Sequence, residues 1–208
     1  MLGTENLPLF IASGLLLNLM PGPDTLYIVG RSISQGRKAG VVSVLGISSG
    51  GTVHTVAAAL GLSAILAASA SAFTVVRLAG AAYLVYLGSR LLLDRTVAAT
   101  AAPELPTQKL WTIYRQGAMT NVLNPKVALF FLSFLPQFVD PASHAKVLAF
   151  LFLGAVFIFN STIYCSLVAW FAAAISTRLR QGSSSSLLAK RATGALFVGL
   201  GLKLAVTR

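Results

Sequence analysis

The chain has 208 residues, of which 56% are hydrophobic and only 10% are charged, and its mean hydropathy is +0.80. A soluble domain carries about 25% charged residues, so this composition excludes a soluble globular protein and predicts an integral membrane protein in contact with lipids. The basic residues behind the net charge of +11 lie between apolar segments, where they set membrane topology, so we reject nucleic acid as a partner.

Six apolar segments are long enough to cross the hydrocarbon core of a bilayer, which needs about 20 residues. They run approximately over residues 7–30, 40–65, 72–93, 116–139, 146–172 and 187–206. The sequence therefore predicts an all-α, polytopic membrane protein with six transmembrane helices. We interpret residues 1–208 as a single transmembrane transporter domain, in which residues 94–115 form a short polar linker rather than a second domain.

A proline motif interrupts the first predicted span, where the sequence reads Asn18-Leu-Met-Pro21-Gly22-Pro23-Asp24. Proline removes a backbone donor and clashes with the preceding helical turn, and an aspartate at membrane depth is costly unless it faces water or a partner. Irregular backbone is tolerated at that depth only where it is buried in protein or lines a cavity. The motif therefore predicts one half of a binding site.

A second motif, Asn121-Val-Leu-Asn124-Pro125-Lys126, interrupts the fourth predicted span and repeats the first. Each half of the chain, approximately 1–95 and 110–208, then has three spans with a break in the first of them. Because three is an odd number, the two halves must have opposite orientations in the membrane. Inverted repeats with interrupted helices are typical of secondary transporters, and the paired interruptions indicate the substrate site.

Lysine and arginine are distributed unequally between the two sides of the predicted membrane. The connections after spans one, three and five hold most of them, and such connections face the cytoplasm. We therefore expect the linker 94–115 to be cytoplasmic and both the N- and C-termini to lie outside the cytoplasm. The residues in these connections are Arg31, Arg37, Lys38, Arg90, Arg95, Lys109, Arg115, Arg178, Arg180, Lys190 and Arg191.

Each break also has the residues that begin a helix. Asn124 is a favoured N-cap and Pro125 is tolerated at the first helical position, while Gly22 can cap a helix that holds Asp24 in its first turn. A helix N-terminus stabilises an anion and disfavours a cation. Asp24 is thus stabilised where it lies, whereas Lys126 requires an anionic group nearby: Asp24, a substrate carboxylate, or both in turn.

These charges match a zwitterionic amino acid. Asp24 would hold the ammonium group, while Lys126 and the amides of its half-helix would hold the carboxylate. The alternative is a structural ion pair of Asp24 and Lys126 that joins the two halves. We favour the substrate site, because burying such a pair contributes little net stability.

Further polar or small residues occur inside other spans. Gly46 and Gly50 lie on one helical face with His54 and predict close helix packing, within one chain or between the two chains of a homodimer. His54 could titrate during proton coupling or bond a neighbouring carbonyl, and both interpretations stay open. Asn160 belongs to a polar patch that lines the pathway or joins helices, and it is kept as a candidate for substrate binding.

Other functional classes find less support in the sequence. A single cysteine, Cys165, excludes an internal disulfide and zinc or redox frameworks, and the spans hold too few ligands for a convincing metal cage, so we expect no metal and no cofactor. We expect no enzyme, because Asp24, His54 and Lys126 follow no nucleophile–base spacing. An exporter of a cation or another small metabolite, and a non-transporting membrane subunit, remain as alternatives.

Taken together, these motifs resemble the LysE/RhtB family of amino-acid exporters. The first motif with Gly36, Gly40 and Gly46 to His54 is similar to that family's first half, and residues 121–131 with 135–138 are similar to its second signature. The resemblance implies a secondary active transporter in the bacterial inner membrane that exports an amino acid or a close derivative, driven by exchange for protons. The positions that carry over are Pro21, Gly22, Pro23, Asp24, Asn124, Pro125 and Lys126.

Overall fold

The computed structural model describes residues 3–20, 22–62 and 106–175, together with seven isolated residues between 71 and 89. The predicted sixth span, 187–206, lies outside the described residues, and isolated residues alone represent the predicted third span, 72–93. The described ranges form α1 (Leu7–Leu19), α2 (Pro23–Ala57), the π-helix η1 (Ala58–Leu62), α5 (Leu110–Val122), α6 (Pro125–Ser133), the 3-10 helix η2 (Leu135–Phe138) and α7 (Lys146–Ile175).

These ranges contain no strand, and their β pairing is an isolated bridge between Thr4 and Val139. The all-α prediction is confirmed for this part of the chain. Two described segments are long and apolar enough to cross a membrane, Pro23–Leu62 and Lys146–Ala174. The bent pair Leu110–Val122 and Pro125–Phe138, with 48° between its axes, is a third candidate.

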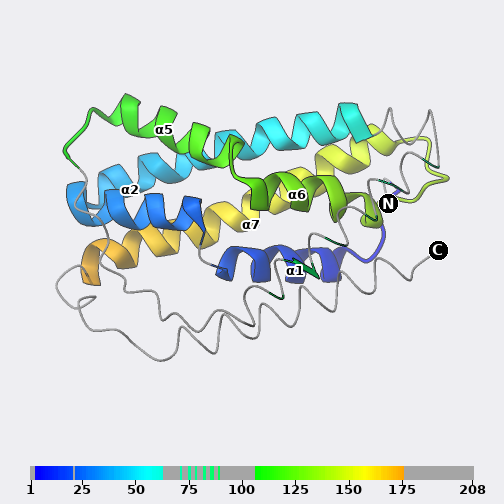
Figure 1. Cartoon of the computed structure of the whole chain (residues 1–208), viewed down its shortest axis with the longest axis horizontal. Coiled ribbons are helices and arrows are strands. Elements are labelled where there is room, and N and C mark those ends of the chain that lie inside the picture. The colour runs from blue at the N-terminus through cyan, green and yellow to red at the C-terminus, as the bar shows by residue number, and fades with distance from the viewer. Residues whose placement is uncertain are drawn as a thin grey trace.

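The long helix α2 folds back on itself at Gly36, whose φ of 78° and ψ of −177° are open to glycine but disfavoured for other residues. Ser32 and Gly40 are eight positions apart, which is about 12 Å along a straight helix. A Cβ added at Gly40 would nevertheless lie 3.2 Å from the Ser32 Cβ. The two parts of α2 therefore run side by side in opposite directions (Figure 1).

Two predicted boundaries were wrong. The connection expected at 31–39 is helical apart from the bend at Gly36, because a single glycine with positive φ reverses the chain without a loop. The fourth span begins at Leu110 rather than 116, since Trp111 and Arg115 continue the helix beyond the most apolar stretch. The fifth, predicted over 146–172, coincides with α7.

One end of the molecule collects basic side chains, and we call it the basic end: Arg31, Arg37, Lys38, Lys109 and Arg115. The α2 bend, the start of α5 and the last turns of α7 meet there (Figure 1). The Arg37 guanidinium lies 4.3 Å above the Trp170 ring, which ties α2 to α7. At the opposite end, Glu5 and Asp140 donate backbone hydrogen bonds to Phe138 and Gly3, respectively.

Two apolar clusters lie along the molecule. The larger packs α1, α6 and α7 around aromatic rings, with Phe130 4.9 Å from Phe157 and Phe10 5.2 Å from Phe138 between ring centroids. The smaller lies nearer the basic end and contains Ile28, Val44, Ile47, Cys165 and Ala169. The two proline breaks fall between these clusters, so their polar groups have apolar packing on both sides.

Candidate functional site

The two breaks lie where the proline motifs predict them. The first helix ends at Leu19, and α2 begins at Pro23 with Gly22 as its N-cap and Asp24 in its first turn. Pro21 lies outside the described residues. A Cβ added at Gly22 would lie 3.2 Å from the Lys126 Nζ, so the close approach of the second break to this turn favours glycine.

The second break has the predicted cap. Helix α5 ends at Val122, α6 begins at Pro125, and the Asn124 side chain accepts a hydrogen bond of 3.0 Å from the Lys126 backbone N–H. This bond satisfies one of the amide groups that a helix N-terminus leaves free. The predicted capping role of Asn124 is confirmed.

The helices before the two breaks match in length and in register. Both α1 and α5 have 13 residues. Asn18 is the second-last residue of α1, and Asn121 is the second-last residue of α5. The similarity of the two motifs therefore extends from sequence to local structure.

Each break contacts the end of the helix that precedes the other break. The Asn121 Nδ2 donates to the Asp24 Oδ2 at 2.8 Å, and the Lys126 Nζ donates to the carbonyls of Leu17 and Met20 at 3.1 and 2.9 Å. A charged residue of one first turn thus binds the last turn of the other half. The contact is reciprocal, because each first turn binds the last turn of the helix before the other break.

Asp24 lies near enough to act on the charge of Lys126, as expected, but the hydrogen bonds of Lys126 go to backbone carbonyls. Its ammonium caps the C-terminus of α1, where unpaired carbonyls carry partial negative charge. These carbonyls offset the unfavourable position of a cation in the first turn of α6. Sequence reasoning missed them, because the helix end that faces Lys126 is more than 100 positions away along the chain.

Four buried polar atoms at the breaks make no hydrogen bond within 3.5 Å among the described residues, although the Asn124 side chain also faces the Asp24 carboxylate. Two are donors, Asn18 Nδ2 and Asn124 Nδ2, and two are acceptors, Asp24 Oδ1 and Asn121 Oδ1. An unpaired buried polar group costs about 1–3 kcal/mol, so a polar ligand that bonds these four atoms would remove that cost.

His54 lies at the same place. Its Nε2 is 3.0 Å from the Asn121 carbonyl oxygen, and its ring centroid is 5.8 Å from that of Phe131. Because a carbonyl only accepts, Nε2 carries the proton of this bond. The structure thus contains the bond to a neighbouring carbonyl, one of the two interpretations that the sequence left open.

Gly46 and Gly50 lie where α2 crosses α5. A Cβ at Gly46 would lie 3.0 Å from the Ala118 nitrogen, and one at Gly50 would lie 2.7 Å from the Asn121 Cβ. Both glycines thus bring α2 against α5 of the same chain. Gly50 in particular packs against the residue that bonds Asp24.

Helix α7 contributes a serine that the sequence reasoning did not single out for the site. The Ser161 Oγ donates to the Asn18 Oδ1 at 3.0 Å, while Thr162 and Ser48 hydroxyls lie 2.7 Å apart and join α7 to α2. Asn160 is the neighbour of Ser161 and is partly exposed. The signal that could have identified Ser161 is its spacing of four from Phe157 and Cys165, since all three share one helical face.

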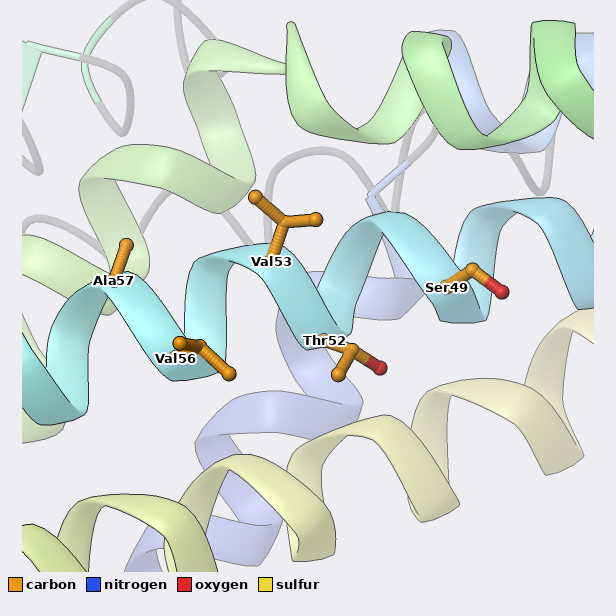
Figure 2. A pocket seen from close by; sticks show the side chains of 5 residues that line it. All are labelled: Ser49, Thr52, Val53, Val56 and Ala57. Atoms are coloured by element: carbon orange, nitrogen blue, oxygen red, sulfur yellow. The ribbon is translucent and has the colours of Figure 1, made fainter.

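A small cavity of about 10 Å³ lies on this face, with room for about one water molecule. Its lining combines groups of the break with apolar side chains from α2 and α7: Ile47, Ser48, Gly51, Asn121, Phe157, Ile158, Ser161 and Cys165. A wider hollow of about 570 Å³ lies elsewhere on α2, where Ser49, Thr52, Val53, Val56 and Ala57 form its wall (Figure 2). None of these five residues was predicted for the site.

The family model of the LysE type translocator matches residues 15–208. The chain belongs to this family. The relatives that this chain matches have about its own length. An uncharacterized membrane protein of Pseudomonas aeruginosa is 32% identical to it, and the match covers 98% of this chain and 96% of that protein. A leucine efflux protein of an Enterobacter species is 28% identical with the same coverage. The membrane protein YrhP of Bacillus subtilis is 28% identical over 93% of this chain and 95% of its own. No solved structure matches the chain.

Membership of this family places the chain among membrane translocators, which agrees with its apolar helices.

Proposed function

We propose that this translocator exports an amino acid from the bacterial cytoplasm across the inner membrane, in exchange for protons. The reciprocal contact of the two breaks, with two unpaired donors and two unpaired acceptors beside it, is the observation that carries the proposal. A zwitterion needs acceptors for its ammonium group and donors for its carboxylate. The breaks offer both within one buried region.

Both halves of the chain contribute to each end of the zwitterion. The ammonium group binds Asp24 Oδ1 and Asn121 Oδ1, which are acceptors without a described partner. The carboxylate binds Asn18 Nδ2 and Asn124 Nδ2, beside the ammonium of Lys126. Charged hydrogen bonds of this kind contribute about 1.5–3 kcal/mol each, which is ample for selective binding.

The proposed architecture is six spans in two inverted repeats. Its support is the pair of 13-residue helices, each followed by a break and a helix that begins with proline. The reversal of α2 at Gly36 makes two antiparallel passes out of one long helix. A cavity of about 10 Å³ is far smaller than an amino acid, so the halves must move apart on one side at a time.

Leucine is the first substrate to test. Relatives named leucine efflux protein share 26–28% of their residues with this chain over nearly its whole length. The apolar part of the cavity wall, Ile47, Phe157 and Ile158, suits a branched aliphatic side chain. The proposed proton carrier is Asp24, with His54 Nδ1 nearby as a relay.

The first prediction tests transport and the role of Asp24 together. Liposomes that contain the purified protein and unlabelled leucine are expected to accumulate labelled leucine by counterflow, unlike empty liposomes. Asp24→Asn should lower proton-driven leucine transport by at least about tenfold, because no other described carboxylate lies at the breaks. Glu5→Gln is the matched control, since Glu5 is an exposed carboxylate away from the breaks.

Two outcomes would contradict the proposal. Absence of counterflow with all twenty amino acids would remove amino-acid transport and favour a non-transporting subunit or another cargo. Unchanged proton-driven transport by Asp24→Asn would retain transport and exclude Asp24 as the proton carrier.

A further inference from the structure

A polar seam runs from the breaks to the basic end, between the first part of α2 and α5. Asp24, Tyr27, Arg31 and Gln35 are spaced three or four positions apart and so share one face of α2. Opposite them lie Asn121 and Gln116 of α5 and Gln108, which comes two residues before α5 begins. Hydrogen bonds join the two sides of the seam along its length: Asp24 to Asn121, Tyr27 to Gln116, Arg31 to Gln116 and Gln108, and Gln35 to Gln108.

Arg31 is the unusual member of this seam, because it is a buried cation with only neutral partners among the described residues. Its side chain is 3% exposed. Its Nη1 donates to Gln35 Oε1 and the Pro106 carbonyl at 3.0 and 2.9 Å, and its Nη2 donates to the Oε1 atoms of Gln108 and Gln116 at 2.8 and 3.0 Å. The Nε–H is buried and has no partner among those residues.

The Arg31 guanidinium has the donors that bind a carboxylate. A guanidinium presents two parallel N–H donors that match a carboxylate in a bidentate pair, and this pair is stronger than bonds to neutral amides. The amide oxygens of Gln108 and Gln116 hold the Nη2 donors without neutralising the charge. An incoming carboxylate replaces them and engages the free Nε–H.

The place of Arg31 along the seam indicates the side of the membrane from which a substrate would reach it. Seven residues separate it from Asp24, which is about 10 Å along the helix. It lies at the basic end, on the side expected to face the cytoplasm, where an exporter takes up its substrate. The aromatic cluster around Phe10, Phe130 and Phe138 packs at the opposite end of the described residues.

We propose that Arg31 is a carboxylate-binding site on the cytoplasmic access route, where the amino acid docks before it moves along the seam to the breaks. This inference rests on the proposed export function and adds a second recognition site to it. The ligand class is an α-amino acid with a free carboxylate.

The test compares leucine with leucinamide, which keeps the ammonium group and side chain but lacks the carboxylate. In inside-out vesicles with the full-length protein, Arg31→Gln should raise the KM for leucine about tenfold, equivalent to about 1.4 kcal/mol. The inhibition constant of leucinamide should change less than about twofold, since its amide lacks the charge that Arg31 recognises. Lys38→Gln is the matched control, because it removes an exposed positive charge from the same end.

A second variant covers the case in which Arg31→Gln does not fold. Gln116→Glu gives Arg31 an internal carboxylate without changing the length of any seam side chain, and it should raise the KM for leucine by competition. If Arg31 were merely structural, the introduced carboxylate would hold it more firmly and leave the KM unchanged, which would overturn the inference.

A third variant, Glu104→Gln, tests whether a carboxylate near Pro106 in the sequence already neutralises Arg31. If Glu104→Gln reproduces the Arg31→Gln defect, Arg31 serves an internal ion pair and the docking site is refuted.

If wild-type vesicles transport leucine while both seam variants keep a normal KM, the inference fails and the export function stands. If wild-type vesicles transport no amino acid, the export function fails and the docking site with it.

Discussion

At the scale of single residues, the site depends on two charges that occupy equivalent places in the two breaks but have different surroundings. Asp24 receives one hydrogen bond from Asn121 and keeps its Oδ1 unpaired among the described residues. Lys126 donates to two carbonyls at the end of α1. The cation is therefore tied to the protein at rest, whereas the carboxylate has an unused acceptor for a ligand.

The second prediction concerns Lys126→Met, which removes both the charge and the two bonds to α1. Buried carbonyls without donors cost about 1–3 kcal/mol, so we expect a lower melting temperature in detergent. Affinity for leucine should fall more than affinity for its amide, because the lost cation faces the carboxylate.

Lys146→Met is the control for this change, since Lys146 begins α7 at the opposite end and away from the breaks. Binding measured by displacement of labelled leucine separates affinity from stability. An equal loss for leucine and leucinamide would argue against carboxylate recognition by Lys126.

At the scale of elements, close packing of α2 on α5 holds the breaks in register. Gly46 and Gly117 bring the two helices together, with a Cβ added at Gly117 only 3.5 Å from the Gly46 Cα. One turn further along, Gly50 lies against Asn121, whose side chain bonds Asp24. Helix packing and ligand recognition are thus coupled through one asparagine.

The third prediction follows from this contact. Gly46→Ala places a methyl group against the backbone of Tyr114 and Ala118, which cannot yield as a flexible side chain can. Overpacking of this kind costs about 1–3 kcal/mol, so the melting temperature should fall and leucine counterflow with it. Gly61→Ala is the control, because a Cβ there meets no atom of the described residues within 4 Å. Equal stability of the two variants would show that α5 can shift away from α2.

At the scale of the whole molecule, the two ends differ in chemistry. The basic end holds the α2 bend and a polar seam, whereas the opposite end holds the aromatic cluster and the pairing of residues 3–5 with residues 138–140. Positive charge favours the cytoplasmic side of a membrane. This asymmetry favours an orientation in which the basic end faces the cytoplasm, which the fourth prediction tests.

The fourth prediction tests this orientation by cysteine labelling. In a Cys165→Ser background, Ala142→Cys should react with a membrane-impermeant maleimide in spheroplasts, because Ala142 is exposed at the end opposite the basic one. Lys38→Cys, also at an exposed position, should react only after permeabilisation. The reverse pattern would place the basic end outside, so Arg31 could not be a docking site on the cytoplasmic side.

Much of the fold and part of the site could be predicted from the sequence, because their causes are local. Low charge and long apolar runs identify a membrane protein, and proline after Gly22 or Asn124 ends one helix and begins the next. The cap formed by Asn124 depends on two neighbouring residues and was predicted correctly. The bend at Gly36 was missed, since a glycine inside a helical pattern does not reveal the sign of its φ.

Only the tertiary structure decided which groups meet. Lys126 binds the carbonyls of α1 and Asn121 binds Asp24 because two breaks about 100 residues apart in the chain face each other. The seam through Arg31 and the position of Ser161 depend in the same way on which helical faces pack together. Hydropathy and caps are properties of neighbouring residues, so the sequence by itself determined the membrane class and the two breaks. The pairing between the breaks arises from packing over long sequence separations, which no local pattern encodes.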